Sequence, residues 1–371
     1  MIGLKALPYP GGIEAVVSEL GSRLVARGHT VTAYVRPRFA QEKAGEHRGI
    51  RLRQVPSLRG KNVDTFSYAA LATLMVVSSG ADLVHYHATG VSVFSWLPRV
   101  LGKPTLVQSH GLDWRRAKWG RLAKLYLRAT DYSTARFPNV TTVVSRVLEK
   151  HYRSRYGRPV VYIPNGVPHV SYRPPERIHE LGLRGDDYIL FVARLVPEKG
   201  CHVLVEAFEH IRPQGLKLVI VGDSHDGDRY ARVLKKHGDR DILFLGFVRG
   251  PLLEELLGNC RLFVLPSEVE GLSTGLLEAM SHGACVLASD IEENCEALGE
   301  AGFYFRAGDA NNLAEKMALL AASPERVRHA GLEAQRRARG LSNWDDVTDQ
   351  YESVYMRMLR RDKPAAIPAA E

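Results

Sequence analysis

The residues of this chain that are best suited to chemistry lie in the segment 266–280, PSEVEGLSTGLLEAM. The apolar run Leu262–Leu265 before it predicts a strand, and the sequence after it predicts a helix that begins near Ser273. Glu270 is then expected in the loop at the carboxyl end of the strand, and Glu278 about one turn inside the helix. The two carboxylates therefore have different surroundings and can do different work.

A helix N-terminus carries unpaired N–H groups and a partial positive charge, which suit a diphosphate. A carboxylate placed like Glu278 can accept hydrogen bonds from both hydroxyls of a ribose. The plainer alternative is that Glu270 caps the helix and Glu278 is only solvated. The residues at the predicted helix start are Gly271, Leu272, Ser273 and Thr274.

A basic pair follows another predicted strand, Tyr188–Val192. Arg194 and Lys199 are five residues apart, and Gly200 opens the next helix. Two such cations can converge on one anionic group. Exposed basic pairs are common on protein surfaces, so this pair alone does not indicate a binding site. The glutamate segment in the same chain is what favours the functional interpretation.

Two further candidates lie in the first third of the chain. Gly11 and Gly12 join a short first strand to a helix, and paired glycines let a backbone approach a phosphate closely, although a lone Gly-Gly is usually a turn. His110 comes directly after the predicted strand Thr105–Ser109 and can reach a sugar hydroxyl. The alternative is a histidine that satisfies local backbone groups.

Short continuous apolar runs that alternate with helical stretches must position these residues. Continuous apolarity indicates strands covered on both faces, and hence parallel sheets with crossover helices. Because the pattern occurs twice, we expect an α/β chain of two doubly wound, Rossmann-like domains that face a central cleft. The predicted strands are Thr30–Val35, Asp82–His87, Thr105–Ser109, Val140–Val144, Tyr188–Val192, Leu216–Val221, Ile242–Phe247, Leu262–Leu265 and Ala284–Ala288.

The boundary between the two domains is expected in the stretch 163–175, which holds four prolines and a glycine. This predicts a first domain over residues 1–168 and a second over residues 169–344. A helix over about 345–361 is expected to pack back toward the first domain, and residues 362–371 form a loose tail.

The composition is that of a globular protein, with 45% hydrophobic and 25% charged residues among 371. No apolar run is long enough to span a membrane, and the first residues do not resemble a secretory signal. The cysteines show no metal-binding spacing and are interpreted as buried thiols of a cytoplasmic protein. They are Cys201, Cys260, Cys285 and Cys295.

The net charge of +9 is distributed unevenly. The first 170 residues hold 25 Lys and Arg against 9 Asp and Glu, whereas the rest holds 25 against 32. The basic front half predicts an anionic partner. The acidic back half and the absence of a recognition motif argue against nucleic acid.

Together these residues resemble the family-four retaining glycosyltransferases, which have the GT-B fold. The match spans nearly the whole chain, and the front half looks like the bacterial branch that makes cell-surface polysaccharides. Members usually begin a few residues earlier, so Met1 falls inside the first strand. The matching pieces are Gly11-Gly12 with Gly28-His29, His110-Gly111, Arg194 with Lys199-Gly200, and Glu270 with Glu278.

The resemblance implies transfer of a sugar from a nucleotide-sugar to a hydroxyl acceptor, such as a lipid-linked or glycan intermediate. A nucleotide-sugar epimerase of the same fold and a non-catalytic nucleotide-sugar-binding protein are the alternatives. The resemblance implies that Gly12, Arg194 and Lys199 contact the donor phosphates, and that His110 and Glu270 contact the donor sugar. It also implies that Phe247 and Val248 hold the base and that Glu278 binds the ribose.

The resemblance also implies a same-face displacement without a cofactor, because Arg194, Lys199 and the helix start can stabilise the leaving diphosphate without a metal. Asp226-Gly-Asp228 imitates a metal-binding D-x-D motif but is interpreted as a solvated turn.

The segment Trp114–Arg128 carries basic residues beside an apolar stripe at helical spacing. It could lie on an anionic membrane surface, as in a peripheral protein of the inner face, and the alternative is a solvated basic face over core residues. The basic residues are Arg115, Arg116, Lys118, Arg121, Lys124 and Arg128.

Overall fold

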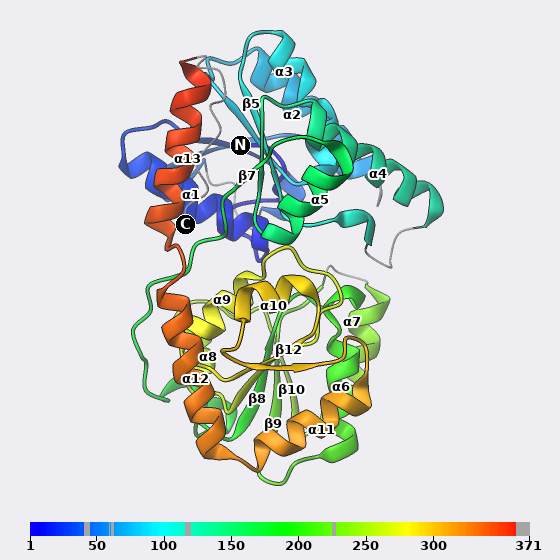
Figure 1. Cartoon of the computed structure of the whole chain (residues 1–371), viewed down its shortest axis with the longest axis vertical. Helices are drawn as coiled ribbons and strands as arrows, with labels where there is room; N and C mark the ends of the chain where they lie inside the picture. Colours follow the sequence, from blue (N-terminus) through cyan, green and yellow to red (C-terminus); the bar gives the residue numbers. More distant parts are fainter. Residues whose placement is uncertain (41–44, 59, 61–62, 116–119, 225–227, 361–371) are drawn as a thin grey trace. The chain divides into compact units, whose positions relative to one another are not determined.

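The computed structural model of the chain describes residues 1–40, 45–58, 60, 63–115, 120–224 and 228–360. The chain divides into two compact units, each with its own core (Figure 1). The first unit contains Met1–Gly166 and the chain from Trp344 onward, and the second contains Val167–Asn343. Arg116, Lys118, Asp226 and the predicted tail lie outside the described residues.

The second unit is built on one parallel sheet in the order β10-β9-β8-β11-β12-β13. Along the unit this is the 3-2-1-4-5-6 order of a doubly wound fold, with its switch point between β8 and β11. The strands are β8 (Tyr188–Val192), β9 (Lys217–Val221), β10 (Ile242–Gly246), β11 (Leu262–Leu265), β12 (Val286–Ser289) and β13 (Phe303–Phe305).

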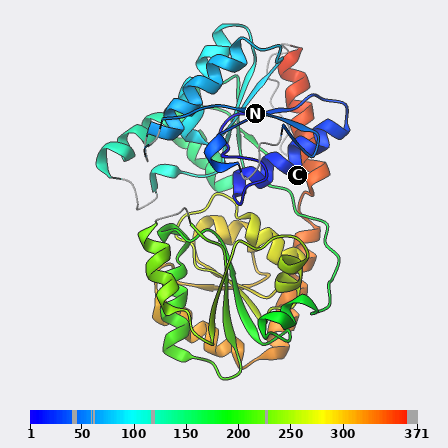
Figure 2. The same ribbon diagram turned by 180° about the vertical axis from the view of Figure 1, so that it is seen from behind.

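Helices cover both faces of this sheet (Figure 2). One apolar core lies under α6, α7 and α11, and the other lies under α8, α9 and α10, while α12 contributes to both. The helices are α6 (Cys201–Ile211), α7 (Arg229–Leu234), α8 (Pro251–Gly258), α9 (Thr274–Ser281), α10 (Glu292–Leu298), α11 (Ala310–Ala321) and α12 (Pro324–Arg339).

The first unit repeats this plan with a short central segment. Residues 1–5 lie between β1 and β4, because Tyr34 N donates to Met1 O (3.0 Å) and His87 N donates to Ile2 O (2.7 Å). This segment joins the sheet β1-β3-β2 to the sheet β4-β5-β6-β7. The strands are β1 (Thr32–Val35), β2 (Glu46–His47), β3 (Ile50–Gln54), β4 (Val84–His87), β5 (Thr105–Ser109), β6 (Val140–Val143) and β7 (Val161–Tyr162).

The last helix of the chain packs on the first unit beside its first helix. Beneath the contact, Trp344, Val347, Tyr351 and Val354 join the apolar core that α1 also buries. The helices of the unit are α1 (Gly12–Ala26), α2 (Val63–Val77), α3 (Trp96–Val100), α4 (Arg121–Arg136), α5 (Arg146–Tyr156) and α13 (Trp344–Leu359).

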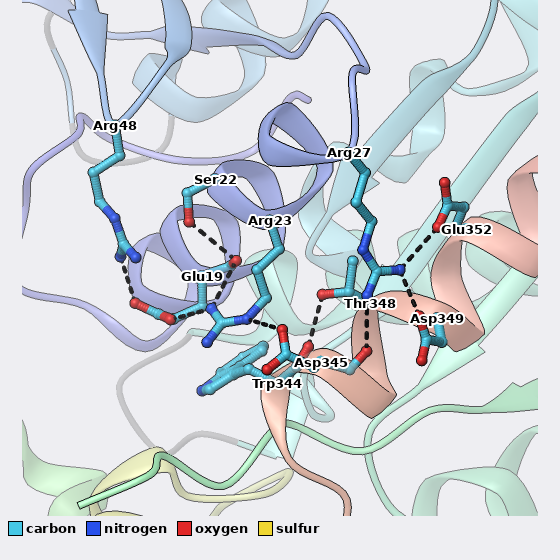
Figure 3. A network of polar contacts seen from close by, with 10 residues as sticks. All are labelled: Glu19, Ser22, Arg23, Arg27, Arg48, Trp344, Asp345, Thr348, Asp349 and Glu352. Carbon is cyan, nitrogen blue, oxygen red and sulfur yellow. Dashed lines mark hydrogen bonds and ion pairs between the residues drawn. The ribbon is translucent and has the colours of Figure 1, made fainter.

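Above this core, ion pairs connect α1 to α13 (Figure 3). Arg23 lies 2.9 Å from Asp345, and Arg27 lies 2.5 Å from Asp349 and 2.8 Å from Glu352. These side chains are partly exposed to solvent, so each pair contributes little to stability, whereas the buried apolar side chains contribute more.

We therefore expect Trp344→Ala to lower the free energy of unfolding by ~3–5 kcal/mol, because it empties a packed position. Arg27→Met should cost at most ~1 kcal/mol, and less at high salt. Urea denaturation followed by circular dichroism measures both. An equal loss in the two variants would show that the ion pairs, and not the core, hold α13.

Strand β4 of the first unit carries polar side chains on the side of α13. In β4, Val84 and Tyr86 enter an apolar core under α2, whereas His85 and His87 face the other way. The His85 and His87 rings stack with centroids 3.9 Å apart, and His85 Nδ1 lies 2.7 Å from the Tyr355 hydroxyl of α13. Burial lowers the pKa of both histidines well below its ordinary value, and lowers the pKa of His110 to about 4.

These histidines predict acid sensitivity. Above pH 6.5, their ordinary pKa, both folded and unfolded states hold them neutral. Below it the unfolded chain binds protons that the folded chain does not, so the free energy of unfolding falls by up to ~1.4 kcal/mol per pH unit for each histidine.

The melting temperature should therefore drop between pH 7 and pH 5, and His87→Gln should make the drop shallower. His210→Gln, at an exposed position, is the matched control. A pH dependence that is the same in His87→Gln as in the wild type would contradict the assignment.

The predicted doubly wound architecture is confirmed, with differences in detail. β2, β3, β7 and β13 were not predicted, and the last helix begins at Trp344 and ends at Leu359. The prediction of four buried cysteines is wrong for Cys295, which is exposed, and only partly right for Cys260, which is half-buried. Cys295 lies on the short helix α10, whose apolar face is supplied by Ala297 and Leu298.

Candidate functional site

Two loops meet at the switch point of the second unit, and each carries one predicted site residue. Lys199 follows β8 and Glu270 follows β11, and the Lys199 ammonium pairs with the Glu270 carboxylate. Their side chains are 17% and 6% exposed, so the pair is held largely out of water. Ligands of doubly wound sheets bind outside the carboxyl ends of the strands at this point.

The backbone fixes the two loops against each other. Gly200 has φ +67°, and a Cβ atom there would lie 2.0 Å from the Pro266 carbonyl oxygen. Glu268 N also donates to Glu198 O across 3.0 Å. Only glycine permits this approach, so the spacing between Lys199 and Glu270 is set by the fold and not by the ion pair alone.

The start of α9 lies directly after Glu270 in the chain. Ser273 caps the helix, since its Oγ accepts from Leu276 N at 3.3 Å, and Thr274 is the first helical residue. The alternative in which Glu270 is the cap is therefore wrong, because its carboxylate is paired with Lys199. Gly271, Leu272, Ser273 and Thr274 thus place a helix N-terminus, with its outward N–H groups, beside that ion pair.

Glu278 lies on α9 beyond the first turn. It is partly exposed, whereas Leu276, Leu277 and Met280 are buried in the core, as the apolar spacing predicted. The two glutamates therefore have different surroundings: Glu270 is buried in an ion pair, and Glu278 is partly exposed to solvent.

The other predicted donor residues also follow strands of this sheet. Arg194 comes two residues after β8 and is partly buried. Phe247 and Val248 follow β10, where Gly246 turns the chain with φ +66°. Phe247 is 46% exposed, and Val248 packs against the core. The carboxyl edge of one sheet thus presents a cation, an ion pair, a helix start and an exposed aromatic ring.

In the first unit, Gly11 and Gly12 form the start of α1. Gly11 is the N-cap in an extended conformation, and a Cβ atom there would lie 2.1 Å from Glu14 Oε2. Glu14 is itself buried, and its other oxygen accepts from Lys5 N at 2.9 Å. Gly11 therefore leaves room for the carboxylate of Glu14, a residue that the sequence analysis did not single out.

His110 lies at the carboxyl edge of the first unit's sheet, directly after β5. Burial holds the ring neutral, and the negative charge of Asp113 opposes this effect on its pKa. Asp113 in turn accepts a hydrogen bond from the Thr89 hydroxyl at 3.2 Å. A neutral imidazole has one donor and one acceptor nitrogen, so His110 can hydrogen-bond to a hydroxyl group in either sense.

The sequence analysis missed the partners of His110. His85, His87 and Tyr355 lie in the same buried region of the first unit. A signal was present, because His85-Tyr-His87 puts two histidines on one face of a strand that is otherwise apolar.

Among the described residues, no group of three or more histidine, cysteine or acidic side chains could hold a metal ion. Asp228 caps α7, since its Oδ1 accepts from Tyr230 N at 2.9 Å.

Helix α4 presents a basic surface on the first unit. Arg121 and Arg128 are exposed, and the single acid of the helix, Asp131, is buried and paired with His151. The Arg115 and Arg128 guanidinium groups lie 5.7 Å and 5.3 Å from the Trp114 ring. In the part of the chain that the structure describes, no helix has the length and apolarity to cross a membrane.

Comparison with known proteins agrees with this geometry. The chain is 26% identical to O-antigen chain mannosyltransferase C of Escherichia coli, over 95% of this chain and 96% of that protein. It is 29% identical to the GDP-mannose-dependent alpha-(1-6)-phosphatidylinositol monomannoside mannosyltransferase of Mycobacterium tuberculosis, over 76% of this chain and 78% of that protein. Anabaena Alr3699/HepE, solved in complex with UDP and glucose, superposes with a TM-score of 0.80 at 18% identity, over 96% of this chain and 98% of that one.

Residues 10–170 match the family described as Glycosyltransferase Family 4, and residues 186–323 match the family described as Glycosyl transferases group 1. The matched ranges cover parts of both units and contain every predicted site residue. With its two doubly wound units in the GT-B fold, the chain belongs to the family-four glycosyltransferases.

Proposed function

We propose that this glycosyltransferase moves a sugar from a nucleoside-diphosphate sugar to a hydroxyl acceptor, with retention of the anomeric configuration, in the synthesis of a cell-surface polysaccharide or glycolipid. The observation that carries the proposal is the Lys199–Glu270 ion pair at the switch point, beside the start of α9. The Escherichia coli and Mycobacterium tuberculosis relatives, with their polysaccharide and lipid names, support the acceptor class.

The donor diphosphate is assigned to Arg194, Lys199 and the start of α9. Without donor, the Lys199 ammonium is neutralised by Glu270. When a donor phosphate replaces Glu270 as the partner of the Lys199 ammonium, the Glu270 carboxylate can accept hydrogen bonds from hydroxyls of the donor sugar. The fold holds both groups in place beforehand, so little reorganisation is needed when charge develops on the leaving phosphate.

The nucleoside is assigned to the neighbouring positions of the same sheet edge. Glu278 is accessible and can accept from both ribose hydroxyls, and Phe247 and Val248 offer an apolar surface for the base. The Anabaena neighbour solved with UDP supports a nucleotide at this type of fold. The base of the donor stays open, since a GDP-mannose enzyme is among the relatives.

Two assignments concern the first unit. His110, as a neutral imidazole, is proposed to hold a hydroxyl of the transferred sugar. The N–H groups at the start of α1, with Gly12 as its first residue, are proposed to donate to a phosphate oxygen.

In the proposed reaction, the bond between the anomeric carbon and the phosphate oxygen breaks, and the acceptor oxygen bonds to that carbon from the same face. The acceptor proton passes to the leaving phosphate, so the products are the glycoside and a nucleoside diphosphate. Arg194, Lys199 and the α9 N-terminus stabilise the departing charge, and no metal is required.

A thermal-shift screen with UDP, GDP, ADP and their common sugar conjugates tests the donor site. One nucleotide series should raise the melting temperature by mass action, and Glu278→Ala should lose most of the rise. Glu315→Ala, an exposed change in the same unit, should keep it. If no nucleotide shifts the folded wild-type protein, the donor assignment fails.

Product analysis by proton NMR tests the reaction class with the donor that the screen identifies. The new glycosidic bond should have the anomeric configuration of the donor, and excess EDTA should leave the rate within about twofold. An inverted product, or a rate abolished by EDTA and restored by Mg²⁺ or Mn²⁺, would contradict the mechanism. Epimer formation from the donor alone would indicate an epimerase instead.

We also propose that α4 rests on an anionic membrane surface. Exposed apolar side chains accompany its basic residues, with Leu125 66% and Tyr126 38% exposed. The Tyr126 ring lies 6.3 Å from Phe66 of α2, which is itself 45% exposed, so the apolar surface continues onto the next helix. Basic and aromatic side chains together are typical of surfaces that bind at the headgroup level.

Flotation with vesicles that contain anionic lipid tests this surface. The wild type should float with the vesicles, and charge reversal at Arg121 and Lys124 should reduce the bound fraction severalfold, since each basic residue contributes about 1 kcal/mol. Reversal at Lys236 and Arg240, exposed on the second unit, is the control and should change little. Equal flotation of both double variants would remove the membrane proposal.

A further inference from the structure

Three histidine rings lie in a row inside the first unit, between the sheet and α13. The His85 and His87 rings are stacked, with centroids 3.9 Å apart and planes at 29°. The His87 and His110 rings are also nearly parallel, with centroids 5.8 Å apart and planes at 26°. At the far end, His85 Nδ1 meets the Tyr355 hydroxyl at 2.7 Å. The row therefore runs from the last helix of the chain to a proposed substrate-binding residue.

The histidine row contains buried polar atoms that have no hydrogen-bond partner in the described structure around them. His85 Nε2, both nitrogens of His87, His110 Nε2 and Gln108 Oε1 are buried without a hydrogen-bond partner among the described residues. A buried polar atom without a partner costs ~1–3 kcal/mol, so such atoms are usually met by ordered water or kept for a function. Side chains of leucine or valine would fill this position in the sheet without that cost.

The tautomers along the row depend on one another. With the Tyr355 hydroxyl as the donor to His85 Nδ1, across 2.7 Å, the tautomer of His85 is fixed. His85 then carries its own proton on Nε2. The dipole of this ring acts on the stacked His87 ring in a medium of low dielectric constant, where such interactions are strong. The nearby Gln108 side chain raises the pKa of His87, against the larger lowering effect of burial.

We propose that His85 and His87 are positioning residues, which transmit the fixed hydrogen bond of Tyr355 to His110 and hold the His110 ring in one plane and one tautomer. The tautomer decides whether the nitrogen that meets a substrate hydroxyl donates or accepts. The activity part of this proposal rests on the sugar-binding role proposed for His110, whereas the tautomer part does not.

Two other titratable groups affect the pKa values of the histidines in the row. The Met1 amine, which donates to Thr32 O at 2.7 Å, lowers the pKa of His85 and His87, and burial lowers the pKa of the amine itself to about 5. Asp113 acts on His110 from the following loop. Neither group lies on α13, so the hydrogen bond from Tyr355 can be removed without changing them.

The test compares Tyr355→Phe with Tyr351→Phe. Tyr351 is buried and Tyr355 is half-buried, on the same face of α13, and both rings lie near the His85 ring. The Tyr351 hydroxyl, however, bonds to Thr142 Oγ1 at 3.3 Å, whereas the Tyr355 hydroxyl bonds to His85. Each change removes one hydroxyl and keeps the ring, so the cost in packing is matched. Long-range ¹H–¹⁵N NMR reports the tautomer of each histidine, with resonances assigned by single His→Gln changes.

In the wild type at pH 7.5, His85 should be the Nε2–H tautomer and His110 should show one tautomer. Tyr355→Phe should move the ring nitrogen shifts of His85, His87 and His110, lower kcat by roughly 3- to 10-fold with little change in donor KM, and shift the pH profile of kcat. Tyr351→Phe should leave all three ring signals and the pH profile as they are.

His87 provides a second test. His87→Gln keeps a donor and an acceptor and should retain more activity than His87→Leu, which keeps neither. If His110 keeps the same ring shifts in Tyr355→Phe as in Tyr351→Phe, the row does not position it and the proposal is wrong, whatever the activity. If the shifts move but the transfer rate does not, the role proposed for His110 fails and the row stands.

Discussion

The ion pair between the Lys199 ammonium and the Glu270 carboxylate, at the carboxyl ends of β8 and β11, is the interaction on which the proposed donor site depends. The 3-2-1-4-5-6 strand order sends the chain in opposite directions after these two strands, so their loops lie next to each other with no crossover helix between them. Gly200 lets the Lys199 loop approach Pro266, and Ser273 starts α9 directly beyond Glu270. A cation, an anion and a helix N-terminus are thereby fixed in one place before any ligand arrives.

The first unit is also doubly wound but has a different strand order and a different core. Its central segment is short, its sheet carries histidines toward α13, and its surface charge is strongly basic along α4. Helix α13 comes last in the chain but completes this unit, because Trp344 and Tyr351 fill the core beside α1. The unit that carries His110 therefore depends on the final helix, and a loss of α13 would expose both its apolar core and its polar row.

The sequence predicted the elements whose signal is local. β8, β11 and the start of α9 near Ser273 were predicted from continuous apolar runs and the helical spacing that follows, because buried parallel strands and helix starts impose these patterns on a few neighbouring residues. β3 was missed because it alternates apolar and arginine residues and most of its side chains are exposed, so it lacks the continuous apolar run of the predicted strands. β7 and β13 are too short to show a period.

Contacts between distant residues could not be predicted in the same way. The Lys199–Glu270 ion pair joins two loops that are 71 residues apart, and the Tyr355–His85 hydrogen bond joins residues 270 apart. Their pairing follows from strand order and from the return of α13 to the first unit, which are properties of the whole fold. The motif spacing predicted Glu270 and Lys199 as site residues, whereas only the structure shows that the two form an ion pair.

Binding of the nucleoside diphosphate product to Lys199→Met and Glu270→Gln, measured by calorimetry, tests the role of this ion pair most directly. Lys199→Met should weaken binding by roughly 10- to 100-fold, the worth of one charged hydrogen bond. Glu270→Gln removes the carboxylate that competes for the ammonium, so it should bind the diphosphate at least as tightly as the wild type while losing sugar transfer. Wild-type affinity in Lys199→Met, or weaker binding in Glu270→Gln, would show that the pair only joins two loops and that the donor phosphates bind elsewhere.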